Sequence, residues 1–127
     1  MKLTTIGTVI AERRLKLSPR VEVIVRIGKP RKFRGYDSYF CPYEILWPDR
    51  RRISHHGGVD AVQALELAMK MIATDLYTSP HAAKLTWLGR RDLGFPVLEA
   101  IRDLVPKDKP LRLPSRKKVA KARKARA

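Results

Sequence analysis

The stretch GGVDAVQALELAMKMIA, residues 57–73, most constrains what this chain can fold into. The polar residues in and just after it share one narrow helical stripe, at positions 63, 66, 70 and 74. A helix with so narrow a polar face must be covered on most of its sides. Asp60 is a favourable N-cap, and Gln63 stands at the spacing of a capping box. The pattern predicts the main core helix, packed across a sheet or buried further against a partner.

The two glycines before this helix have two interpretations. Gly57 and Gly58 could give the chain a sharp entry from a strand into the helix. They could also form a phosphate-binding turn at the helix N-terminus. The second interpretation is disfavoured, because the segment lacks the glycine spacing and the Lys-Ser/Thr pair of a P-loop and Asp60 adds negative charge there. We expect the glycines to build the fold.

Strand patterns precede the helix. Residues 9–17 and 21–27 alternate apolar and polar side chains, and residues 39–47 and 51–55 read as a third and a fourth strand. Short turns between most of them predict an antiparallel meander. Pro42 removes one backbone donor, so the third strand is expected to lie at a sheet edge or to be bulged there.

A second, shorter helix is predicted over residues 97–105. Its apolar residues follow a helical spacing, Pro96 suits the first turn, and Pro106 ends it. Residues 1–106 are therefore expected to form one α+β domain. In that domain an antiparallel meander of about four strands packs against one long helix and a shorter one.

The rest of the chain, residues 107–127, is a basic tail. The whole chain carries 28 Lys and Arg against 12 Asp and Glu, a net charge of +16, and the tail alone holds ten basic residues and one acid. With few apolar residues to bury, the tail is expected to be disordered in isolation. Such a segment suits phosphate contacts that give affinity without sequence information. The residues expected to bind nucleic acid there are Arg116, Lys117, Lys118, Lys121, Arg123, Lys124 and Arg126.

A second basic segment, residues 28–38, joins the second and third strands. Arg31, Lys32 and Arg34 are its predicted nucleic-acid contacts, with Phe33 and Tyr36 interleaved among them. A basic and aromatic patch of this kind is typical of single-strand binding surfaces. The alternative is a solvated loop whose aromatic rings pack back onto the sheet.

The sequence offers no constellation for catalysis. Cys41 is the lone cysteine, so no intrachain disulfide can form, and His55 and His56 point to opposite faces if they lie on a strand. Neither a cofactor, nor a metal site, nor a small-molecule substrate is evident. The longest uncharged run is too short for a membrane span. We expect a cytoplasmic protein that is not an enzyme.

Several short motifs together resemble a family of small uncharacterised bacterial proteins built on a domain of unknown function. They are Ile10–Arg13, Ile27–Pro30, Cys41–Ile45, Gly58–Leu65 and Leu93–Pro96. The resemblance covers about residues 9–105 and implies an α+β domain, without an activity or site residues.

Two functions remain open at this point. The first is non-specific nucleic-acid binding through the basic tail, with help from the basic loop. The second is a protein-interaction or structural domain, such as a homodimer formed through the apolar helix or an edge strand, for which the tail is incidental.

Overall fold

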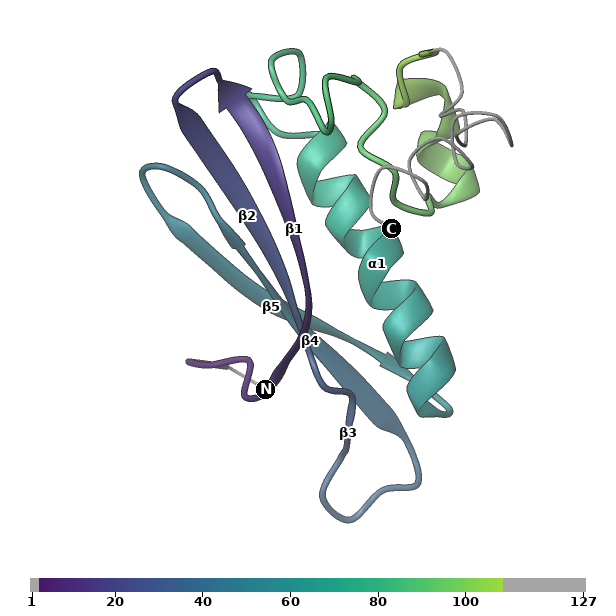
Figure 1. Cartoon of the computed structure of the whole chain (residues 1–127). Helices are drawn as coiled ribbons and strands as arrows, with labels where there is room; N and C mark the ends of the chain where they lie inside the picture. The colour runs from purple at the N-terminus through teal and green to yellow at the C-terminus, as the bar shows by residue number, and fades with distance from the viewer. Residues whose placement is uncertain (1–2, 109–127) are drawn as a thin grey trace, which may run out of the picture.

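The computed structural model describes residues 3–108 as an antiparallel sheet with one long helix on one of its faces (Figure 1). The predicted α+β class is confirmed. The elements, in chain order, are β1 (Val9–Ser18), β2 (Val21–Gly28), β3 (Arg31–Lys32), β4 (Tyr39–Leu46), β5 (Arg51–Gly58), the helix α1 (Ala61–Tyr77) and a 3-10 helix η1 (Glu99–Leu104).

Strand β4 lies inside the sheet, so the edge position suggested by Pro42 is wrong. One side of β4 pairs with β5 along its whole length, and the other side pairs with β2 and then with the two-residue strand β3. Pro42 lies opposite the interruption between β2 and β3, where no ladder donor is needed. Gly28 fits this gap because a Cβ there would collide with the Pro42 ring and with the Ile6 carbonyl.

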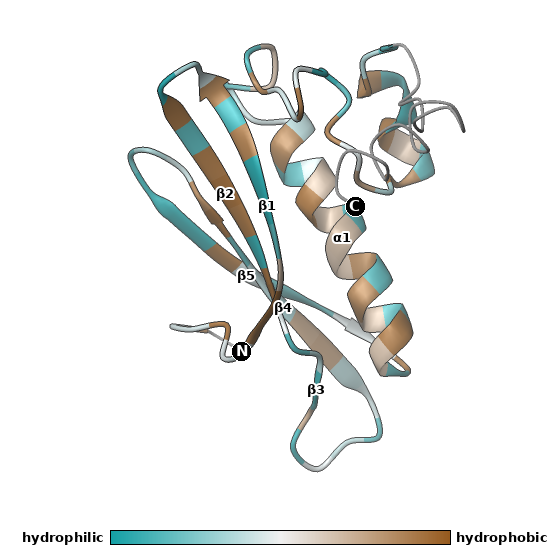
Figure 2. Cartoon of the chain, viewed as in Figure 1, coloured by the Kyte–Doolittle hydropathy of each residue, from teal (hydrophilic) through white to brown (hydrophobic). Residues whose placement is uncertain are grey.

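The core lies between the sheet and α1. Apolar and polar segments alternate along β2, as the colours in Figure 2 show, and its buried residues Val23, Val25 and Ile27 belong to the core. Ala64 and Ala68 let the helix approach the sheet closely, and both are fully buried. Burial of each large apolar side chain in this layer contributes about 1.5–3 kcal/mol. The largest of these are Leu15, Tyr43, Ile45, Ile72 and Leu76.

Helix α1 begins at the predicted cap. The Asp60 carboxylate accepts a hydrogen bond from the Gln63 amide at 2.8 Å. The Gln63 side chain reaches back to the amide of Val59, at 2.8 Å, one residue before the position used in a standard capping box. Gly58 lies directly against the first turn, where a Cβ would collide with the backbone of Ala64. This close approach explains the glycine structurally.

After α1 the chain returns over the core in an extended path. The Tyr77 hydroxyl accepts a hydrogen bond from the Leu93 amide at 2.8 Å, which ties this return segment to the helix. The predicted second, shorter helix is present as a 3-10 helix over Glu99–Leu104, which is shorter than the predicted residues 97–105. Pro96 lies before this helix and not in its first turn, since Leu98 is still extended.

Among residues 3–108, no helix lies on the face of the sheet opposite α1 (Figure 1). Part of it is covered by residues before β1. Ile6 is buried there, and Arg51 donates a hydrogen bond to the Thr4 carbonyl at 3.1 Å. Within residues 3–108, no helix is both long and apolar enough to cross a membrane.

Candidate nucleic-acid interface

The predicted basic loop is a hairpin between β3 and β4 that extends beyond the rest of the sheet (Figure 1). Two backbone hydrogen bonds close it, from Phe33 to Ser38 at 2.9 Å and from Tyr36 to Phe33 at 3.1 Å. Gly35 at its tip has a φ of +81°, a conformation that glycine adopts without strain. The sequence therefore forms a defined turn that presents its side chains at one end of the molecule.

The hairpin carries the three predicted cations Arg31, Lys32 and Arg34, all of them exposed, with Arg31 and Lys32 on opposite faces of β3. Lys32 pairs with the Asp37 carboxylate at 3.6 Å. The Arg31 guanidinium lies 5.1 Å from the centre of the Phe40 ring. Among the described residues, neither Arg31 nor Arg34 has an ion-pair partner. Two of the three cations are thus available to an external anion.

The two aromatic residues of the hairpin lie in different environments. Phe33 packs back onto the sheet, with its ring centre 4.9 Å from that of Phe40 and 6.4 Å from that of His55. Tyr36 points away from the sheet and is 71% exposed. One ring therefore belongs to the fold and only one remains accessible to a base.

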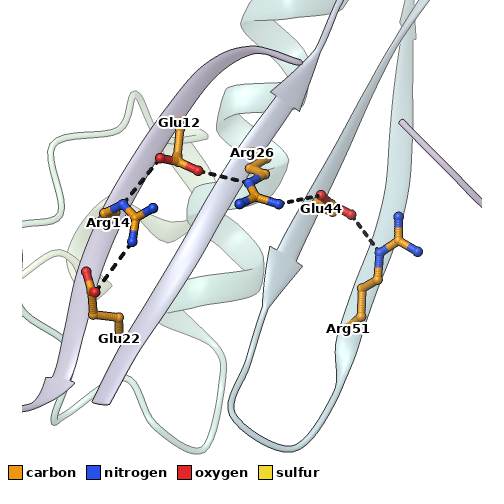
Figure 3. Close-up of polar contacts among 6 residues, drawn as sticks. All are labelled: Glu12, Arg14, Glu22, Arg26, Glu44 and Arg51. Carbon is orange, nitrogen blue, oxygen red and sulfur yellow. Dashed lines mark hydrogen bonds and ion pairs between the residues drawn. The ribbon is translucent and has the colours of Figure 1, made fainter. Parts of the chain in front are cut away.

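Most charges on the uncovered face of the sheet neutralise one another. Figure 3 shows them as a row across four strands, alternating in sign: Glu22, Arg14, Glu12, Arg26, Glu44 and Arg51. Within this charge ladder the shortest contacts are Arg51 Nε–Glu44 at 2.6 Å and Arg26 Nε–Glu12 at 2.9 Å. The Arg26 hydrogen bond is the main cause of the lowered pKa of Glu12. The ladder has no excess positive charge to offer to a polyanion.

The predicted tail contacts lie outside the described residues. They are Arg116, Lys117, Lys118, Lys121, Arg123, Lys124 and Arg126.

The lone cysteine is unsuited to nucleophilic attack. Cys41 is fully buried, and its Sγ donates to the Gly28 carbonyl at 3.5 Å. Burial raises the pKa of the thiol to about 11, which removes the reactive thiolate at neutral pH. His56 pairs with Cys41 in the ladder, whereas His55 lies on the opposite face beside Phe40, as predicted for adjacent strand residues. No group of three potential metal ligands occurs within residues 3–108.

A second polar feature was missed by the interpretation of the sequence. Arg13 lies on the helix-facing side of β1, where its guanidinium stacks between Trp87, at 4.0 Å, and Phe95, at 4.6 Å from the ring centres. It donates one hydrogen bond, to the Leu93 carbonyl at 3.1 Å. Desolvation by burial lowers the pKa of this guanidinium. The available signal was a cation in the apolar row of an alternating strand.

A family model described as a domain of unknown function (DUF6968) matches residues 11–97, which is more than half of the chain. The chain belongs to this family. Searches of curated proteins and of solved structures found no match. The resemblance predicted from the sequence is confirmed at the level of the family, and the family description specifies no ligand and no reaction.

Proposed function

We propose that this protein binds nucleic acid without sequence specificity, through its basic tail and the β3–β4 hairpin. The observation that carries this proposal is the uneven distribution of the net charge. Nine of the 16 excess positive charges fall in residues 107–127, while the six charges of the sheet ladder pair among themselves. The charge available to a polyanion is therefore concentrated in two segments.

The hairpin would fix the orientation of a bound nucleic acid relative to the sheet, which the tail alone would not do. Arg31 and Arg34 are exposed on a closed turn, and Tyr36 beside them offers an accessible ring. Phosphates would contact the two guanidinium groups, and an unpaired base could stack on the tyrosine. In this arrangement the tail provides most of the affinity, and the hairpin orients the strand relative to the sheet.

Fluorescence anisotropy with a labelled duplex and a labelled single strand, over a series of salt concentrations, tests this proposal. Each phosphate contact on duplex DNA contributes about −0.9 to the slope of log K against log salt. We expect a chain ending at Asp108 to lose most of that slope. Asp108 is retained because its carboxylate accepts a hydrogen bond from the Asp92 amide.

A full-length triple variant, with glutamine at Arg31, Lys32 and Arg34, should lose about 1.8 from the slope for the two available cations, and up to about 2.7 if Lys32 leaves Asp37 to contact a phosphate. The matched control places glutamine at Lys16, Arg20 and Lys84, which are exposed and lie away from the hairpin. It removes the same charge and should leave the slope nearly unchanged. Failure of the wild-type protein to bind either probe near physiological salt would reject the proposal.

The alternative is self-association, with the tail incidental. It is favoured by exposed apolar residues near the start of α1, since Val59 and Val62 are each 73% exposed. Sedimentation equilibrium at low and high salt separates the two hypotheses, because a dimer formed by apolar contacts would persist in high salt. A Val59→Ser and Val62→Ser double variant should then be monomeric.

Three further expectations from the sequence remain proposals. We expect a bacterial source because of the family resemblance, and a cytoplasmic location because the chain has a single cysteine. We also expect no enzymatic activity, since the lone thiol is buried and protonated at neutral pH.

A further inference from the structure

Arg13 is a largely uncompensated cation on the inner side of the molecule. Its guanidinium has five N–H donors, of which one hydrogen bonds to the Leu93 carbonyl. Within residues 3–108 it forms no ion pair and no other hydrogen bond. The flanking rings of Trp87 and Phe95 offset part of the desolvation cost through cation–π contact. Arg13 is partly buried, and among the described residues no opposite charge pairs with it, although partly desolvated charges favour such a partner.

The same arginine lines a pocket between β1, β2, α1 and the return segment. The pocket has a volume of about 150 Å³. Apart from Arg13 and Glu12 its lining is apolar or glycine, with Ala11, Val25, Ile27, Met69, Phe95 and Pro96 as the main contributors. An enclosed apolar cavity of about this volume accommodates a molecule the size of benzene, and this pocket is open to solvent beside its exposed residues Ala11, Gly94 and Pro96. The pocket therefore combines a small apolar volume with one cation.

Glu12 does not supply the missing negative charge. Its two carboxylate oxygens already contact Arg26, at 2.9 Å, and Arg14, at 3.3 Å, in the charge ladder. Neighbouring residues of a strand point to opposite faces, so this carboxylate lies on the other side of the sheet from the Arg13 guanidinium. An external anion would meet Arg13 without competition from this residue.

We propose that this pocket binds a small monocarboxylate with an apolar body, whose carboxylate pairs with Arg13. A carboxylate matches the planar fork of a guanidinium, and the apolar body would occupy the volume between Ile27, Met69 and Phe95. A nucleotide is a poorer fit, because its ribose and phosphates need polar walls and more space. This site is separate from the hairpin and does not depend on nucleic-acid binding.

Titration of the full-length, ¹⁵N-labelled protein, followed by ¹H–¹⁵N NMR, tests the pocket with three probes. Benzoate has both the charge and the apolar body, benzamide is nearly the same shape without charge, and acetate has the charge without the body. We expect saturable shifts for benzoate at the amides of Ala11, Ile27 and Gly94, which line the pocket. Benzamide should bind at least about tenfold more weakly, because it lacks the charge-assisted hydrogen bonds. Acetate should give no saturable shift at these amides.

Two variants locate the interaction. Arg13→Gln should abolish the preference for benzoate over benzamide. Met69→Trp should fill the pocket and abolish binding of both probes while leaving Arg13 in place. If Arg13→Gln fails to fold, the wild-type comparison of the three probes and the Met69→Trp variant decide the matter.

Other outcomes would overturn the proposal. Equal binding of benzoate and benzamide would mean that Arg13 has only a structural role, in packing against the Trp87 and Phe95 rings. Benzoate shifts that match those of acetate, or that persist in Met69→Trp, would show anion attraction by the basic surface and no pocket. The absence of saturable shifts with benzoate would reject the site altogether.

Discussion

The adjacent glycines of β5 allow a sharp test of the packing between the sheet and α1. In Gly58→Ala the new Cβ would lie 2.9 Å from the Ala64 Cα, closer than side-chain carbons approach a backbone. Relieving this contact would require α1 or β5 to move, because the contacted atoms are backbone atoms of the helix and Ala64 is fully buried in the core. Such overpacking typically costs 1–3 kcal/mol, and the rigid neighbour places this case near about 3 kcal/mol.

Gly57→Ala is the matched control, since the same methyl group is added one residue earlier. There the nearest atoms are the Tyr39 carbonyl oxygen at 3.5 Å and a Phe33 ring carbon at 3.7 Å, which are ordinary contacts. Replacing a strand glycine at an open position is expected to stabilise the fold by about 0.5–1 kcal/mol. Urea unfolding followed by circular dichroism measures both free energies. Equal losses in the two variants, or no loss in Gly58→Ala, would refute the argument that close approach to α1 requires Gly58.

Two further predictions concern buried ionisable groups. Burial raises the pKa of Cys41 from 9.0 to about 11 and that of Tyr43 from 10.0 to about 12. Below its unfolded pKa each buried, protonated group therefore stabilises the folded state by roughly 3 kcal/mol, and this contribution is lost as the pH rises from 9 to 12. Urea unfolding at pH 8 and pH 11 should show the loss, and Cys41→Ala should show less of it, whereas identical pH dependence in the two proteins would contradict the assignment. Secondly, Glu44→Gln should lower the unfolding free energy by about 1–2 kcal/mol, because Glu44 is only 7% exposed between Arg26 and Arg51. Glu12→Gln, at 34% exposure, should cost less than about 1 kcal/mol in the same assay, and the reverse order would count against the ladder argument.

The parts of the fold with regular periodicity could be predicted from the sequence. Alternation in residues 9–27 predicted two strands, and the single polar stripe of α1 predicted a helix packed on the sheet. Asp60 marked the N-cap at which that helix begins. Two details depart from local rules because long-range geometry overrides them. Pro42 lies in an inner strand because its neighbour strand is interrupted opposite it. The second helix is reduced to Glu99–Leu104, although the apolar spacing extended over residues 97–105.

The candidate sites were predictable to different degrees. Charge counting located the hairpin cations, but only the structure separates the free Arg34 from the paired Lys32. The Arg13 pocket could not be predicted, because its walls come from strands, helix and return segment that are distant in sequence. The alternating pattern of β1 did place Arg13 in the apolar row. An isolated cation in such a row is therefore a useful signal for a buried or ligand-binding guanidinium.

The charge ladder leads to a prediction about which cations bind a polyanion. Arg14→Gln and Arg34→Gln remove the same formal charge from exposed side chains, so attraction by net charge alone predicts equal effects on nucleic-acid binding. Direct contact predicts different effects, because Arg14 is held by Glu12 at 3.3 Å and Glu22 at 3.5 Å, whereas Arg34 has no such partner among the described residues. We expect Arg34→Gln to reduce the salt slope by about 0.9 and Arg14→Gln to leave it almost unchanged. If the two variants bind alike at every salt concentration, the hairpin has no special role and the tail must act alone.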